Sequence, residues 1–333
     1  MMMARSGGRA VRCLVSLAVL LWCMPVVEAQ AWKPTRPVAF IVGAAGGGGS
    51  LDLTARTLQR IWDDGRTIGT PIVVINKPGA GNGIAWSYLN ERGEDGHSIA
   101  IGTTNLVSNP VMGAHHIGHR DVTPLAILFD DYFILLVRAD SPLKSAAEVK
   151  QRLAKDPAAL SFGFGPGLGA GSHTAAAVFV KALGVDVAKG RFVPFKGAAE
   201  AVTAMIAGDI DIVSATAVNA PPFIAAGRTR AIGVIAPQRL GGALAHVSTA
   251  REQGIHADFT NWRAVIGPKG MRREHVAFWV QALSVANKSE AWQKDLARNF
   301  WRENFLTGKA ADDFLDQQAA VFRTLWAEMG VKK

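Results

Sequence analysis

The feature that most constrains this chain is an order of elements that occurs twice. Residues 38–42, VAFIV, form a short apolar run typical of a buried strand, and the glycine-rich residues 43–49 separate it from a segment with helical spacing. A strand, a short loop with lysine and glycine, a helix and another strand are expected next. Residues 159–214 show the same order. This alternation predicts an α/β fold with two lobes, each an open, mostly parallel sheet flanked by helices.

The expected elements have the following bounds. Strands are predicted at residues 38–42, 71–75, 97–102, 159–164, 191–195 and 209–214. Helices are predicted from Ser50 or Leu51 onward and at residues 84–89, 172–183 and 200–207. Residues 129–137 should carry the chain into the second lobe, and residues 259–266 should bring it back. Residues 272–329 are predicted to be helical, with Phe314, Val321 and Leu325 on one apolar stripe.

Two such lobes would place both glycine loops in one cleft. In open α/β sheets the functional loops follow the carboxyl ends of the strands. If the lobes face each other, residues 43–49 and 165–171 point into the space between them. Clefts between lobes commonly hold small molecules.

The N-terminus resembles an export signal. Arg5, Arg9 and Arg12 precede an apolar stretch over residues 13–27, which is shorter than the roughly 20 residues needed to span a bilayer. Small residues around Ala29 suggest cleavage after Ala29 or Ala31. Both cysteines lie inside residues 1–29, so the mature chain would have no disulfide, thiol nucleophile or cysteine metal site. We expect an exported, soluble protein.

The charge of the mature chain favours anionic partners only weakly. Without residues 1–29 it has 33 basic and 26 acidic residues, a net charge of +7. The basic residues are dispersed and not interleaved with aromatic residues, so nucleic acid is not an expected partner.

The first glycine loop, GAAGGGGSLD, lacks the Gly-Lys-Ser/Thr of a P-loop, and neither glycine loop fits G-x-G-x-x-G. Free backbone N–H groups before a helix favour an anion, although a permissive turn is an alternative. Asp52 is expected to make hydrogen bonds at the helix start or to hold the loop.

Ser172 and His173 raise the possibility of a hydrolase. They lie outside a G-x-S-x-G elbow, and neighbours on a helix point in different directions, so a dyad is not expected. Ser172 is interpreted as an N-cap whose hydroxyl can also contact a ligand. For His173 we leave two roles open, donation to a ligand carboxylate and a hydrogen bond across the loop.

Other polar groups follow predicted strands. Lys196-Gly197 follows one strand, and Thr103, Thr104 and Asn105 follow another, where they suit a polar ligand. His115, His116 and His119 have metal-like spacing but lie in a predicted loop, so no functional metal site is expected. With no paired carboxylates and no nucleophile beside a base, the sequence indicates a binding protein that uses no cofactor.

Four segments resemble the Bug-type (TctC-like) extracytoplasmic substrate-binding proteins of tripartite tricarboxylate transporters. They are RPVAFIVGAAGGGGSLDLTAR, VVINKPGAGNGIA, GVDVAKGRFVPFKGAAEAVTAMIAGDIDI and NWRAVIGPKGM. The likeness runs from about Trp32 to Gly330. The chain departs from the family at three places. GLGAGSHTA is about one residue shorter than the family's usual pattern, and Gly43 stands where the family often has proline. RAVIGPKGM differs from the family's commoner RGVVAPKGT at positions that are not expected to touch ligand.

The resemblance implies a two-lobed, type II-like periplasmic binding protein. It implies a signal peptide over residues 1–29, a first lobe of residues 30–134 and 257–333, and a second lobe of residues 135–256. The implied ligand is a small carboxylate held mainly by backbone N–H groups and water. The implied contacts are Ala45, Gly46, Gly47, Gly48, Thr103, Thr104 and Asn105 in lobe one, and Gly169, Gly171, Ser172, His173, Phe195, Lys196, Gly197 and Asp211 in lobe two.

The implied partners are the large and small membrane subunits of a transporter, served by a monomeric receptor. A ligand sensor that acts on a membrane kinase is the alternative, and a secreted hydrolase using Ser172 and His173 is a further one.

Overall fold

The computed structural model describes residues 32–44, 46, 50–93, 95–165 and 167–330. The described residues from Lys33 to Gly330 form one unit by their contacts, and it contains two sheets. Across the described residues, no helix combines the length and the apolar character needed to cross a bilayer. The predicted signal lies outside the described residues.

Within the described residues, the first sheet has six strands in the order β11-β4-β10-β3-β1-β2. The strands are β1 (Val38–Val42), β2 (Ile72–Asn76), β3 (Ser98–Thr103), β4 (Val122–Asp131), β10 (Asn261–Pro268) and β11 (Arg302–Leu306). Strand β1 pairs in parallel with β2 and β3, whereas β10 is antiparallel to β3 and β4. The sheet is therefore mixed.

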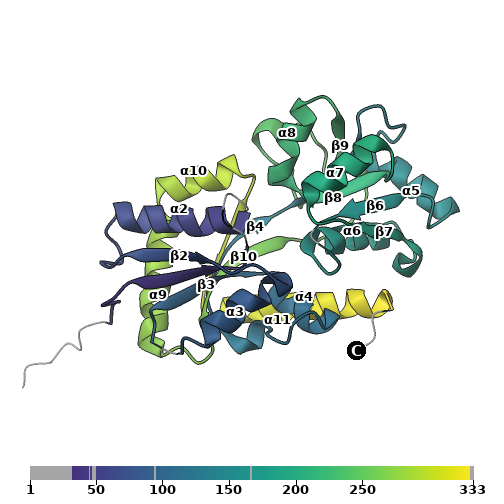
Figure 1. The fold of residues 1–333 in the computed structure, drawn as a ribbon. Coiled ribbons are helices and arrows are strands. Elements are labelled where there is room, and N and C mark those ends of the chain that lie inside the picture. The colour runs from purple at the N-terminus through teal and green to yellow at the C-terminus, as the bar shows by residue number, and fades with distance from the viewer. Residues whose placement is uncertain (1–31, 45, 47–49, 94, 166, 331–333) are drawn as a thin grey trace, which may run out of the picture. The chain divides into compact units, whose positions relative to one another are not determined.

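Strand β1 shows why this sheet is covered on both faces. All five of its residues are buried. Val38, Phe40 and Val42 belong to one apolar cluster, and Ala39 and Ile41 belong to another, because successive side chains of a strand point to opposite faces. Helices on one face are α2 (Ser50–Asp64), α9 (Arg273–Asn287) and α10 (Glu290–Arg298). Those on the other are α3 (Gly83–Asn90), α4 (Asn105–Met112) and α11 (Lys309–Glu328) (Figure 1).

Within the described residues, the second sheet has five strands in the order β7-β6-β8-β5-β9. They are β5 (Phe133–Arg138), β6 (Ser161–Phe164), β7 (Arg191–Pro194), β8 (Ile212–Thr216) and β9 (Thr229–Ile235). Its helices are α5 (Ala146–Lys155), α6 (Gly171–Ala182), α7 (Ala198–Ala207) and α8 (Ala220–Ala225). Strands β6, β7 and β8 pair in parallel, and β5 is antiparallel to β8 and β9.

Short 3₁₀ helices complete the described elements. They are η2 (Ala80–Asn82), η3 (His119–Asp121), η4 (Val187–Lys189), η5 (Ala217–Asn219), η6 (Gly242–Leu244) and η7 (Arg251–Gln253).

The chain passes between the sheets twice, by a short passage after β4 and by a longer one after β9, which ends at Ile235. Strand β4 ends at Asp131 and β5 begins at Phe133, while the return leads from β9 into β10 at Asn261. One apolar cluster includes residues of both sheets. Helix α11 packs against α4 and β4, and its last turns reach α6, where the rings of Trp326 and His173 lie 4.9 Å apart (Figure 1). The two sheets therefore share part of their core.

The predicted α/β fold with two sheets and two connecting passages is confirmed, but the sheets are mixed and not mostly parallel as predicted. Among the described strands, antiparallel pairings join β10 to β3 and β4, β11 to β4, and β5 to β8 and β9. Two predictions for the C-terminal region are wrong. Residues 302–306 form an edge strand, which the sequence hides because Arg302 and Glu303 are exposed and interrupt any apolar run. On α11, Leu325 is buried, but Val321 is 41% exposed because the buried face follows Ala311, Leu315, Ala319, Phe322 and Trp326.

Candidate functional site

A cavity of about 670 Å³ lies between the two sheets, where strands of both end. Strands β1 and β3 reach it at their carboxyl ends, as do β6 and β8 of the second sheet. The described lining residues are Gly43, Ala44, Ser50, Leu51, Pro78, Gly79, Gly81, Asn82, Thr103, Asn105, Phe133, Gly165, Ala170, Gly171, Ser172, Lys196, Ala198, Ala215, Thr216, Asn219, Asn261 and Arg263. This is the position at which open α/β sheets bind ligands.

Hydrogen bonds to Asn76 hold the start of the first glycine loop. Its amide nitrogen donates to the carbonyl of Ala44 at 3.0 Å and to Oδ1 of Asp52 at 2.9 Å. Asp52 is buried, and its Oδ2 accepts from Nε of Arg56 at 2.8 Å. The expectation that Asp52 holds the loop is confirmed. At Gly43 an added Cβ would lie 2.3 Å from Oδ1 of Asn82, so only glycine permits this approach.

Two loops of the second sheet meet backbone to backbone. A Cβ added at Gly165 would lie 2.6 Å from backbone atoms of Gly197. The N–H of Gly167 donates to the carbonyl of Phe195 at 3.2 Å, and the hydroxyl of Ser172 donates to the carbonyl of Gly165 at 2.7 Å. Ser172 lies in the first turn of α6, whose N-cap is Ala170, so its interpretation as the N-cap is wrong. The glycines let these loops form one wall of the cavity.

His173 lies behind that wall. Its ring is stacked on Phe164 at 4.3 Å, and its Nδ1 accepts a hydrogen bond from the N–H of Gly169 at 3.1 Å. Burial lowers the pKa of His173 to about 4, so the ring is neutral at pH 7. Of the two roles left open for His173, the structure contains the hydrogen bond across the loop. Ser172 and His173 have different partners, which gives no support to a nucleophile and base.

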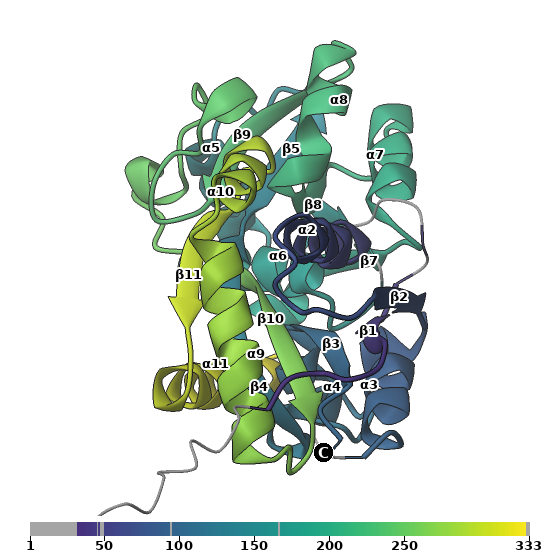
Figure 2. The same ribbon diagram turned by 90° about the vertical axis from the view of Figure 1, so that its left-hand side faces the viewer.

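Several helices begin at the cavity. Its lining includes Ser50 and Leu51 at the start of α2, and Asn105 at the start of α4. It also includes the first residues of α6 and α7. Figure 2 shows α2 nearly end-on. The first N–H groups of an α-helix lack acceptors inside the helix and carry the positive end of its dipole. The wall therefore offers backbone donors from both sheets to an anion.

Two charged side chains, Lys196 and Arg263, belong to the described lining, and both are cations. Lys196 is exposed and comes from the second sheet, and Arg263 comes from β10 with a side chain that is 6% exposed. Among the described lining residues there is no aspartate or glutamate. The electrostatic character of the described wall thus favours negative ligands.

The structure places some of the predicted site residues at the cavity. Thr103, Asn105, Gly171, Ser172 and Lys196 line it. Ala45, Gly47 and Gly48 lie outside the described residues. Gly46 is described, but it is not part of the lining. The hydroxyl of Thr104 donates to Oδ1 of Asn261 at 3.3 Å, so Thr104 supports a lining residue from behind.

Gly169, His173, Phe195 and Gly197 are not part of the lining and instead hold the loops of the second sheet. Asp211 is remote from the cavity. Its carboxylate accepts from the backbone N–H and the hydroxyl of Ser161, at 2.8 and 2.7 Å. Because Asp211 precedes β8, it lies at the amino end of a strand whose carboxyl end reaches the cavity.

Sequence reasoning missed three groups of lining residues. Gly79, Gly81 and Asn82 lie in NKPGAGN, part of a segment that carries the family resemblance, but the resemblance implied no ligand contact there. Thr216 and Asn219 follow β8, and the rule of carboxyl strand ends could have found them. Phe133, Asn261 and Arg263 lie where the chain crosses between sheets, which no local motif marks.

The histidine-rich loop has other partners. The rings of His115 and His116 stack at 4.6 Å, and Nε2 of His119 lies 2.9 Å from a carboxylate oxygen of Asp316. In the described part of the chain, no three histidine, cysteine, aspartate or glutamate side chains group in a way that could hold a metal ion.

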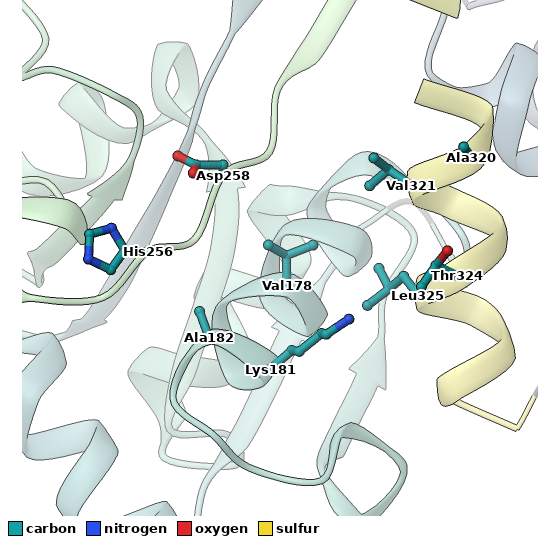
Figure 3. Close-up of a pocket in the computed structure, with 9 residues that line it drawn as sticks. All are labelled: Val178, Lys181, Ala182, His256, Asp258, Ala320, Val321, Thr324 and Leu325. Atoms are coloured by element: carbon teal, nitrogen blue, oxygen red, sulfur yellow. The ribbon is translucent and has the colours of Figure 1, made fainter. Parts of the chain in front are cut away.

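A second cavity, of about 550 Å³, lies between α6 and α11 (Figure 3). Val178 and Ala182 of α6 face Val321 and Leu325 of α11, with His256 and Asp258 at one side. Lys181 at its edge forms an ion pair with Glu328 at 2.7 Å. This groove is mostly apolar and is not bordered by helix starts, so it does not share the anion-binding character of the first cavity.

Comparisons with known proteins agree with this geometry. The model of a family described as tripartite tricarboxylate transporter family receptor (TctC) matches residues 55–321. A UPF0065 protein from the tcbD–tcbE intergenic region of a Pseudomonas species is 29% identical over 278 residues, 82% of this chain and 80% of that protein. A UPF0065 protein of Bordetella pertussis is 30% identical over 240 residues, 71% and 72% of the two chains.

Solved structures show the same fold. A TctC solute binding protein from Polaromonas is 27% identical with a TM-score of 0.72, and the match covers 89% of this chain and all of that one. The periplasmic binding protein BugD is 25% identical with a TM-score of 0.74, covering 90% of this chain and all of that one. MatC of Rhodopseudomonas palustris, whose structure has bound malate, is 24% identical with a TM-score of 0.70 over 88% and 99% of the chains.

Proposed function

This chain belongs to the tripartite tricarboxylate transporter receptor family, and from that premise we propose that it binds a small organic carboxylate in the cavity between its sheets. Members of this family are receptors of the periplasmic-binding-protein class and not enzymes. The ligand is proposed to be an extracytoplasmic solute, which the protein would deliver to a membrane transporter.

The observation that carries the proposal is the convergence of helix starts on one cavity. The first residues of α2, α4, α6 and α7 lie in the wall, together with Lys196 and Arg263. Each helix start offers N–H donors and a partial positive charge, worth about 0.3–1 kcal/mol toward a negative group. A carboxylate oxygen accepts several such hydrogen bonds at once.

The size and polarity of the cavity support a small polar ligand. A volume of about 670 Å³ falls within the range of roughly 300–1,000 Å³ common for small-molecule sites. The lining hydroxyl and amide groups, among them Thr103, Asn105, Ser172 and Thr216, can orient further polar groups of the ligand. The related fold of MatC holds malate, a dicarboxylate, which supports the same class of ligand here.

The cellular context is part of the proposal. We infer that residues 1–29 are an export signal, cleaved after Ala29 or Ala31. Residues 30–134 and 257–333 would form one lobe and residues 135–256 the other, which the division of strands between the two sheets supports. A monomeric receptor would close on the ligand and pass it to the large and small membrane subunits.

Ligand-induced stabilisation tests the proposal. Protein freed of co-purified ligand is heated with malate, succinate, adipate, citrate or benzoate, each paired with its neutral amide. One acid present at 100 times its Kd should stabilise the fold by about 2.7 kcal/mol, and its amide should not. If none of the acids raises Tm, or if the amides act equally well, the carboxylate assignment fails.

A further inference from the structure

Arg263 connects the cavity wall to a buried carboxylate. Its Nη2 donates to the hydroxyl of Ser50, at the start of α2, at 3.0 Å. Its Nη1 donates to the carbonyls of Asn261 and Trp262 at 3.0 and 3.1 Å. These bonds fix the guanidinium beside the cavity that it lines. Its Nη2 also lies 3.6 Å from Oδ2 of Asp131.

Asp131 is fully buried at the end of β4, where the chain crosses to the second sheet. Its Oδ2 accepts from the amide of Asn261 at 3.5 Å, and Oδ1 of Asn261 in turn accepts from the hydroxyl of Thr104 at 3.3 Å. Asn261 itself lines the cavity. The carboxyl group of Asp131 therefore lies behind the cavity wall, in contact with the lining residues Arg263 and Asn261.

Among the described residues, the charged and titratable groups that act on Asp131 or adjoin it come from β10, β4, Tyr132 and β11. Strand β10 contributes Arg263, and β4 contributes Asp130, whose carboxylate accepts instead from Thr260 at 2.9 Å and Asn304 at 3.1 Å. The phenol of the adjacent Tyr132 has a pKa raised to about 12 by burial and stays neutral, and Arg302 of β11 lies by Asp130 and Tyr132. Ser50, the first residue of α2, and Thr104, the residue before α4, also belong to this network, and both are uncharged.

Electrostatics makes the state of Asp131 matter to an anion in the cavity. While Asp131 is ionised, its charge cancels that of Arg263 in the same low-dielectric wall. Burial raises the pKa of Asp131 to about 7, even though Arg263 and Asn261 act to lower it. Burial also lowers the pKa of Arg263, but arginine starts high enough to stay charged. Protonation of Asp131 thus leaves Arg263 with an uncancelled charge.

We propose that Arg263 is the residue that selects for a carboxylate in this cavity and that Asp131 positions and neutralises its guanidinium, so that an anion binds together with a proton that Asp131 takes up from solvent. The inference rests on the proposed function, because it requires an anion in the cavity.

Calorimetric titration tests it at pH 6.5 and pH 8, in buffers with different heats of ionisation. The probe is the most strongly stabilising acid among malate, succinate, adipate, citrate and benzoate. Binding to the wild-type protein should weaken about tenfold from pH 6.5 to pH 8 and should take up a fraction of a proton. Asp131→Asn should bind with equal affinity at both pH values, without proton uptake, and more tightly than the wild type at pH 8.

The role of Arg263 needs a variant that avoids an unpaired buried carboxylate. Arg263→Met alone would leave Asp131 without its cation, so it is combined with Asp131→Asn. This double variant should bind the acid at least tenfold more weakly than Asp131→Asn at both pH values. Asp130→Asn changes the neighbouring carboxylate, which has other partners, and should keep the wild-type difference between pH 6.5 and pH 8.

The outcomes separate two failures. If no acid binds the wild-type protein, the proposed function fails, and the inference fails with it. If an acid binds but the affinity of the wild-type protein is the same at both pH values, or if the double variant binds as tightly as Asp131→Asn, the inference is overturned while the receptor function stands.

Discussion

Acid should weaken this fold through His173, and the effect can be calculated. The folded pKa of about 4 lies below the ordinary value of 6.5, because burial disfavours the charged ring. Between these values the unfolded chain binds a proton that the folded chain does not. The contribution of the neutral His173 ring to the free energy of unfolding is therefore complete above pH 6.5 and is lost as the pH falls toward 4. The full loss is about 3 kcal/mol, and about 2 kcal/mol is lost at pH 5.

The loss has a structural cause. A protonated Nδ1 cannot accept the hydrogen bond from Gly169, and a charged ring would be enclosed between Phe164 and Trp326. Ala170 and Gly171, which follow Gly169 and line the cavity, would then lose this support.

Urea unfolding, followed by tryptophan fluorescence at pH 7, 6, 5 and 4, measures this effect in the wild type and in His173→Gln. Glutamine stays neutral and can still accept from Gly169. Between pH 7 and pH 4, the free energy of unfolding of the wild type should fall by about 3 kcal/mol more than that of His173→Gln. A constant difference for His173→Gln would refute the reasoning.

Three further predictions concern the wall of the cavity. Gly165→Ala should lower the free energy of unfolding by about 1–3 kcal/mol, because the added Cβ would lie 2.6 Å from backbone atoms of Gly197. Gly241→Ala is the control: its Cβ would enter open space, so its free energy of unfolding should stay within about 0.5 kcal/mol of the wild type in the same urea titration. Asp131→Asn should become more stable relative to the wild type as the pH rises from 4 to 7, by up to about 4 kcal/mol. The reason is that the wild-type carboxyl group, whose pKa is raised by burial, must ionise inside the fold. A difference in urea midpoint between the two proteins that does not change with pH would contradict this. Lys196→Ala should weaken carboxylate binding less than tenfold at low salt and should not weaken it at high salt, because this cation is exposed and salt screens its charge. A loss of affinity that calorimetry finds to be the same at low and high salt would contradict this.

The repeated order of strands, glycine loops and helices in the sequence predicted most of the fold. VAFIV and the glycines after it predict β1 and the start of α2 at Ser50, because continuous apolar residues suit a strand buried on both faces. The strand at residues 302–306 could not be predicted in this way. Its pairing with β4 stabilises it, and Arg302 and Glu303 conceal it.

The site was predictable where a residue follows a strand in sequence. Thr103, Asn105 and Ser172 were found because they follow strand ends or glycine loops. Arg263 was not, because its position in the wall depends on how β10 enters the sheet beside β4, some 130 residues away in sequence. Asp211 was assigned to the site from a motif likeness, although it precedes its strand.

Mass spectrometry of the small molecules released when the freshly purified protein is denatured tests the central claim most directly. The account predicts one predominant organic acid, released in near-stoichiometric amount, which rebinds to the stripped protein. A released molecule without a carboxylate that rebinds to the same cavity would contradict it.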